Sequence, residues 1–282
     1  MKLALCIGIN DYPGTMNDLN WCVSDSAAWK QMLELQGFKV TWLTDKNATA
    51  HNILTEIYAM ALVTGVEDEV VVTYSGHGTQ VWDKDGDEAD GYDEAICAYD
   101  RNVIDDEFRQ AIMSFNPDTR VTFFLDSCFS GTCTRKRATS RRKARFMPSD
   151  VPSGMKPKKK FMSGMHEILL SGCADDEYSY EGMVGDSGWG MFTYYSMASY
   201  HEGMTYREFY AKIREHLPSN NFPQTPQLEC DEEKKDLVMF DSVGGDVEPE
   251  PVEEESWFKR NWAWVLFIAS VVFLLFVYFF VK

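Results

Sequence analysis

One stretch decides the fold: Glu69-Val70-Val71-Val72-Thr73-Tyr74-Ser75-Gly76-His77-Gly78. It opens with a β-branched, apolar run that is typical of a buried strand, and the run ends at a histidine between two glycines. A second run of this kind, 121–125, leads into Asp126-Ser127-Cys128-Phe129-Ser130-Gly131. In an open α/β sheet, chemistry collects beyond the carboxyl ends of the strands. We therefore expect His77 and Cys128 to meet there as base and nucleophile.

Strands alternate with helices through the rest of residues 1–241. We expect further strands at 2–9, 38–43, 167–173 and 237–240, and helices at 25–35, 49–63, 105–115, 190–200 and 205–216. Gly37 is a plausible stop for the first helix. This alternation predicts an α/β fold with a mostly parallel sheet that helices cover on both faces.

The charge of the chain is strongly uneven. The 282 residues carry a formal net charge of −17, which argues against nucleic acid and favours cationic ligands. Segment 134–160, however, holds eleven Lys or Arg against one acid, Asp150. It has no apolar period, so we expect a loop or a disordered segment. Its charge suits two ligands, the acidic body of the same chain or anionic lipid head groups.

The seven cysteines give no metal motif, because no Cys-x-x-Cys pair occurs and the five histidines are scattered. Residues 1–9 run into the fold without a cleavage site for a signal peptide. We expect free thiols in a reducing compartment.

Four motifs together resemble the metacaspases, a branch of the caspase-like cysteine peptidases. They are Tyr-Ser-Gly-His-Gly-Thr-Gln at 74–80, Gly-x-Asp-Glu at 91–94, Asp-Ser-Cys-x-Ser-Gly at 126–131 and Gln-Thr-Pro-Gln at 224–227. The resemblance covers residues 1–241. It implies a caspase-like three-layer α/β/α sandwich with a mostly parallel central sheet. It also implies a large catalytic part at 1–133, a cleavable basic linker at 134–160 and a small part at 161–241.

The resemblance assigns the chemistry to a Cys-His dyad. Cys128 would attack the peptide carbonyl, and His77 would take its proton and later protonate the leaving amine. The backbone N–H groups of Gly78 and Cys128 would stabilise the oxyanion. Cys133, five residues further on, is expected to be a bystander.

The resemblance also implies a preference for Arg or Lys before the cleaved bond, at the P1 position. The metacaspase S1 pocket corresponds to Asp25, Ser75 and Asp126 in this sequence, and two carboxylates select a cationic side chain. Asp25 as a helix N-cap is an alternative. Two other functions stay open: a peptidase with another P1 residue, such as Asp or Asn, and a catalytically idle membrane adaptor or scaffold of the same fold.

The resemblance further implies activation by Ca²⁺ through Asp93, Asp105 and Asp106. The acidic stretch 83–94 is not expected to be an EF-hand, because Glu88 stands where that loop needs glycine. Arg135 stands near a further carboxylate position of the family, and a solvated acidic loop is the alternative. By resemblance, we expect a monomer.

The chain ends in an apolar tail. Residues 242–256 are expected to form an acidic spacer, and 262–281 contain no charge and reach roughly 30 Å as a helix. We predict a single transmembrane helix within 257–282, a membrane anchor. Lys259 and Arg260 precede it and only Lys282 follows, so the catalytic body is expected in the cytoplasm.

Overall fold

The computed structural model describes residues 1–82, 92–129, 142–148, 167–174 and 177–241. Residues Met1–Val243 form one compact unit. Within the described ranges, no helix is long and apolar enough to cross a membrane. The predicted spacer 242–256, the predicted anchor 257–282, Cys133, Arg135 and most of the basic linker lie outside the described residues.

The unit is built on a six-stranded sheet with the order β12-β9-β7-β3-β1-β2. Five strands are parallel to their neighbours, and β12 is antiparallel to β9. The strands are β1 (Lys2–Gly8), β2 (Lys39–Thr44), β3 (Glu69–Ser75), β7 (Arg120–Asp126), β9 (Ile168–Ser171) and β12 (Gln227–Glu229). The mostly parallel α/β architecture predicted from the sequence is confirmed.

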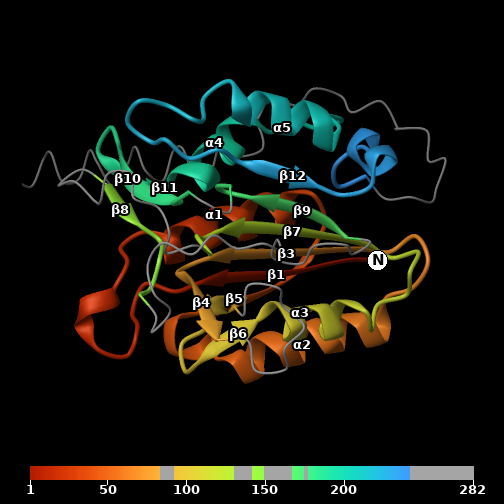
Figure 1. The fold of residues 1–282 in the computed structure, drawn as a ribbon. Coiled ribbons are helices and arrows are strands. Elements are labelled where there is room, and N and C mark those ends of the chain that lie inside the picture. The colour runs from red at the N-terminus through yellow and green to blue at the C-terminus, as the bar shows by residue number, and fades with distance from the viewer. Residues whose placement is uncertain (83–91, 130–141, 149–166, 175–176, 242–282) are drawn as a thin grey trace, which may run out of the picture. The chain divides into compact units, whose positions relative to one another are not determined.

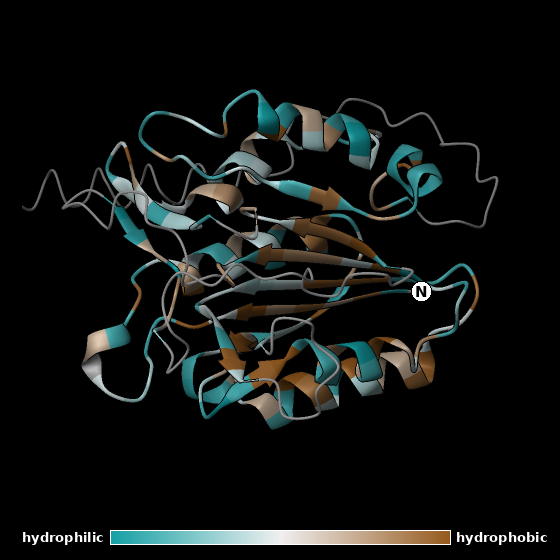
Figure 2. Ribbon diagram, viewed as in Figure 1, coloured by the Kyte–Doolittle hydropathy of each residue, from teal (hydrophilic) through white to brown (hydrophobic). Residues whose placement is uncertain are grey.

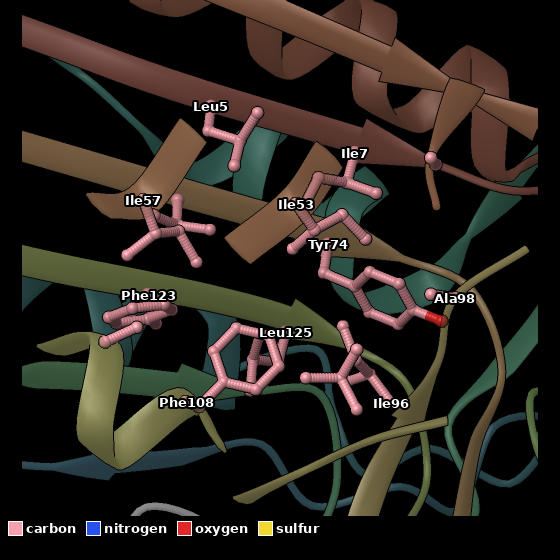
Figure 3. Close-up of a cluster of buried hydrophobic side chains, with 14 of the residues drawn as sticks. Leu5, Ile7, Ile53, Ile57, Tyr74, Ile96, Ala98, Phe108, Phe123 and Leu125 are labelled. Atoms are coloured by element: carbon pink, nitrogen blue, oxygen red, sulfur yellow. The ribbon is translucent and has the colours of Figure 1, made fainter. Parts of the chain in front are cut away.

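The central strands are apolar on both faces because helices cover both sides of the sheet. In Figure 2 much of the central sheet is brown, the colour of hydrophobic residues. On one side pack α2 (Ala50–Val63) and α3 (Asp105–Ile112), and Figure 3 shows Ile53, Ile57 and Phe108 against the sheet. The other side carries α1 (Cys22–Leu35), α4 (Met191–Ser199) and α5 (Tyr206–Arg214) (Figure 1).

Local signals fix several helix ends. The Thr49 side chain accepts a hydrogen bond from the backbone of Asn52 and caps α2. Thr205 and Glu208 form a capping box at the start of α5. Gly37 has a φ of 83°, as expected of the residue that ends α1. Helix α1 begins at Cys22, three residues before the predicted start.

Two small antiparallel sheets flank the central one. One consists of β4 (Gly78–Trp82), β5 (Tyr92–Cys97) and β6 (Asn102–Ile104), and the other of β8 (Arg142–Ala144), β10 (Tyr180–Val184) and β11 (Ser187–Gly190). The prediction of a loop was wrong for Arg142–Ala144. This segment has no apolar period, but β10 supplies the backbone partners that make it a strand.

The strand predicted at 237–240 was also wrong. The backbone of Phe240 takes a φ of 56°, which no strand accommodates. Met239 and Phe240 instead pack into the core, and Val238 makes only an isolated bridge to Thr205. The edge position beside β9 goes to β12.

Candidate active site

The register of two parallel strands brings the predicted dyad to one level. Ser75 of β3 lies opposite Asp126 of β7, and His77 and Cys128 each follow two residues later. Both side chains are buried. The carboxyl ends of β3 and β7 point toward the end of the sheet where β8, β10 and β11 lie (Figure 1).

The histidine is held in one tautomer. Its Nε2 lies 2.7 Å from the backbone oxygen of Asn17, and a carbonyl only accepts, so Nε2 carries the hydrogen. Nδ1 then holds a lone pair, and it makes no hydrogen bond among the described residues. Burial lowers the pKa of His77 to about 4, against the opposing effect of the Asn17 hydrogen bond. The ring is therefore neutral at pH 7 and can accept a proton at Nδ1.

The sulfur of Cys128 lies against the backbone of Ser179. It accepts a hydrogen bond from that N–H at 3.1 Å. The thiol of Cys173 also interacts with this sulfur, and the hydrogen bond to Cys128, together with burial, raises the pKa of Cys173. Among the contacts of the described residues, none joins this sulfur to the His77 ring. The dyad members share one level of the sheet without a direct hydrogen bond.

Two backbone N–H groups converge on one carbonyl oxygen, that of Arg145. Gly78 donates to it at 3.0 Å and Cys128 at 3.3 Å. The chain on both sides of Arg145 is bound as an extended strand. Its own N–H donates to Ser179, and the N–H of Met147 donates to the carbonyl of Gly78. The Arg145–Phe146 peptide bond is thus held beside the candidate nucleophile.

The side chain of Arg145 is fully buried in an acidic pocket. Its Nη1 lies 3.0 Å from Asp126, and its Nη2 lies 2.5 Å from Asp25 and 3.8 Å from Glu181. Gly190 forms a wall of this pocket, because a Cβ atom there would meet Asp126 and Arg145 within 2.4 Å.

Neighbouring donors hold the two predicted carboxylates in place. Asp126 accepts hydrogen bonds from the hydroxyl of Ser179 and from both the N–H and the hydroxyl of Thr193. Asp25 accepts one from the N–H of Gly190. Burial raises the pKa of Asp25 to about 7, and the Arg145 guanidinium opposes that rise. The pocket is therefore built for a cation.

The family model of the caspase domain matches residues 1–238, nearly the whole of the described unit. The chain belongs to the caspase-domain family. Its similarity to metacaspases, which the sequence motifs predicted, is confirmed by curated relatives of this caspase domain. Metacaspase-4 of Arabidopsis thaliana is 39% identical over 141 residues, 46% of this chain and 34% of that protein.

Other relatives extend the comparison. Metacaspase-1 of Schizosaccharomyces pombe is 27% identical over 286 residues, 81% of this chain and 67% of that protein. A solved protein of Geobacter sulfurreducens has a TM-score of 0.67 at 26% identity, over 86% of this chain and all of that one. The caspase domain aligns with about a third of the length of several metacaspases that it resembles.

The structure brings most of the predicted site residues together. Asp25 and Asp126 both contact Arg145, and Gly78 and Cys128 both donate to its carbonyl. Asp25 does not cap α1, because Trp21 holds that position. Ser75 is buried opposite Asp126, but no contact between its side chain and Arg145 is found among the described residues.

The predicted calcium ligands do not form a site in the described residues. Asp93 lies in β5, and Asp105 and Asp106 begin α3. Arg109 already lies 3.3 Å from Asp105 and 3.5 Å from Asp106. The described part of the chain contains no group of three acidic, His or Cys side chains that could hold a metal ion. Two of the three predicted calcium ligands, Asp105 and Asp106, are thus paired with Arg109 in this structure.

The sequence did not predict the role of Glu181 in the pocket or the hydrogen bonds of the Gln224 side chain. Glu181 is a single acid in a short glycine-containing strand, so no local pattern marks it. Gln224 belongs to a recognised motif whose role only the structure explains. Its amide accepts from the N–H of Tyr180 and donates to the carbonyl of Gly172 and the hydroxyl of Ser179. It thereby fixes the strand that runs beside Arg145.

Proposed function

We propose that this caspase domain is a cysteine endopeptidase that cleaves after Arg or Lys. One observation carries the proposal: the carbonyl oxygen of Arg145 lies between the N–H groups of Gly78 and Cys128 while its side chain fills the acidic pocket. This is the arrangement that peptide cleavage needs, because the ends of two neighbouring strands, β3 and β7, bring the oxyanion donors and the nucleophile to one carbonyl.

The dyad divides the reaction into two steps. Nδ1 of His77 takes the proton of the Cys128 thiol, and the sulfur attacks the P1 carbonyl carbon. Negative charge develops on the oxygen that Gly78 and Cys128 hold. The C–N bond then breaks, the imidazolium gives its proton to the leaving amine, and an acyl-enzyme remains. Water, deprotonated by the same ring, releases the acid and restores the thiol. The Asn17 carbonyl keeps the ring in the tautomer that this requires.

The pocket favours Arg over Lys at P1. The two terminal nitrogens of Arg145 reach different carboxylates, Nη1 to Asp126 and Nη2 to Asp25. A guanidinium can satisfy both at once because its donors form a fixed fork, whereas a single ammonium cannot span them in the same way. An acidic P1 side chain would be repelled.

The domain is also proposed to cut its own linker. Arg145 lies in the predicted segment 134–160, and its carbonyl is already bound as a substrate carbonyl would be. The Arg145–Phe146 bond is therefore the proposed site of self-processing. Of the basic linker residues, Arg142, Lys143 and Arg145 all contact the body of the protein, which supports a role as its own ligand.

Peptides that end in Arg, Lys or Asp before a fluorophore test the activity of the full chain. We expect cleavage of the Arg peptide, slower cleavage of the Lys peptide and none of the Asp peptide. Cys128→Ala should lower the rate on the order of 10³-fold or more. An equal rate in Cys128→Ala would contradict the assignment, and complete inactivity of the wild type towards all three peptides would favour a scaffold.

Calcium stimulation and membrane anchoring remain proposals that rest on the family resemblance and the apolar tail. Assays with calcium and with chelator test the first. Because Arg109 pairs with Asp105 and Asp106, we expect stimulation only if these carboxylates exchange that partner for the ion. Asp93→Asn should then abolish stimulation, and a rate unaffected by chelator would refute it.

A further inference from the structure

A second arginine of the linker, Arg142, is bound three residues before Arg145. Strand β8 pairs with β10 in antiparallel register, Arg142 opposite Gly182 and Ala144 opposite Tyr180. If Arg145 is P1, as the proposed function has it, Arg142 is P4. The Arg142 side chain is only 9% exposed, which is rare for an arginine in a linker.

The guanidinium of Arg142 lies over an aromatic ring. Its central carbon is 4.7 Å from the centre of the Tyr180 ring, within the range of a cation–π interaction. Nη1 also donates to the backbone carbonyl of Asn221. A guanidinium can stack on a ring and donate hydrogen bonds in its own plane at the same time. A backbone carbonyl only accepts hydrogen bonds, so it favours a side chain that donates one.

The register explains why this ring is open to a side chain at P4. Arg142 and Ala144 lie on the same face of β8, as residues two apart do in a strand. On β10, Arg142 is paired with Gly182, which has no side chain, and Ala144 is paired with Tyr180. The glycine and the small Ala144 leave the ring face to Arg142, which reaches it along the diagonal between strands.

We propose that Tyr180 and the Asn221 carbonyl form an S4 subsite that selects arginine. The preferred substrates of the proposed peptidase then carry Arg-x-x-Arg before the cleaved bond. The P3 residue contributes less, because Lys143 is half-exposed and its amine donates to the backbone carbonyl of Asp18. Gln224 supports the subsite by holding the N–H of Tyr180 at 3.0 Å.

Peptides based on Arg-Lys-Ala-Arg-Phe-Met, with citrulline, Ala or Lys replacing the P4 Arg, test this inference. Pairs of peptides compete for the full-length protein, so the ratio of kcat/KM does not depend on the fraction that is active. Citrulline keeps the shape of Arg without its charge. We expect Arg to exceed citrulline by roughly 5- to 30-fold, the effect of one desolvated cation–π contact. Replacing the P3 Lys should change the rate less.

Enzyme variants provide the matched control. Tyr180→Phe keeps the ring and should keep the preference, whereas Tyr180→Leu should reduce it to near unity. A P4 ratio within twofold in the wild type, on peptides that are cleaved after Arg, would overturn the S4 subsite and leave the proposed activity intact. An unchanged ratio in Tyr180→Leu would overturn the role of the ring. Failure to cleave any Arg peptide would overturn both proposals.

Discussion

The backbone nitrogen of Cys128 lies 3.3 Å from the carbonyl oxygen of Arg145, a residue of the linker that follows it in the chain. The backbone of the candidate nucleophile therefore holds the carbonyl group of the Arg145–Phe146 peptide bond. The donor from Gly78, at 3.0 Å, completes the pair. Because Arg145 fills the acidic pocket at the same time, the linker would compete with a substrate of the proposed peptidase.

Neutralising either pocket carboxylate should impair cleavage after Arg. Asp126→Asn leaves a buried guanidinium without one of its counter-charges, a loss that raises KM by roughly 30-fold or more. Asp25→Asn should act similarly, and Glu181→Gln less, because Glu181 lies 3.8 Å from Arg145. Initial rates over a range of substrate concentrations check this. An unchanged KM in Asp126→Asn would remove Asp126 from the pocket.

A methyl group at Gly190 should close the pocket. This residue has a φ of −67°, which alanine also adopts, so the effect is steric rather than conformational. A Cβ atom would lie 2.3 Å from Asp126 and 2.4 Å from Nη1 of Arg145. We expect Gly190→Ala to lower kcat/KM for Arg peptides roughly 10- to 100-fold.

Gly65→Ala is the matched control, because nothing lies within 4 Å of a Cβ atom at that position. It should leave the rate unchanged. Wild-type activity in Gly190→Ala would show that the P1 side chain lies elsewhere.

The activity should rise with pH through about 7. Burial raises the pKa of Asp25 to about 7, so this carboxylate loses its charge as the pH falls below that value and the pocket loses affinity for a cation. His77, with a pKa of about 4, stays neutral over the same range and is not the cause. The profile of kcat/KM from pH 5 to 9 measures this, and Asp25→Asn should flatten it near 7. An unchanged rise of kcat/KM near pH 7 in Asp25→Asn would assign the titration to another group.

The catalytic strands were predictable because their signal is local. Two continuous apolar runs each end in a glycine-flanked reactive residue, and parallel pairing then places His77 and Cys128 at one level. The part played by Arg145 was not predictable, because it depends on which of eleven basic residues meets the pocket in space. Strand β8 forms from partner backbone rather than from its own pattern. Phe240 shows the converse, an apolar residue in an apolar run whose backbone conformation is not that of a strand.

Removing residues 257–282 should release the protein from membranes and leave cleavage of Arg peptides unchanged. The residues of the dyad, the pocket and the central sheet all lie within residues 1–241. Carbonate extraction of the full chain and of the truncated chain, followed by peptide assays on both, checks the two expectations. A full-length chain that stays soluble after extraction would refute the anchor.

We propose that the linker is bound as a substrate at Arg145–Phe146. Mass spectrometry with N-terminal sequencing of the purified wild type tests it most directly, beside Cys128→Ala and Arg145→Gln. We expect a new N-terminus at Phe146 in the wild type, its absence in Cys128→Ala and its loss or relocation in Arg145→Gln. A Phe146 terminus in Cys128→Ala as well, or an active wild type that is never cut after Arg145, would contradict it.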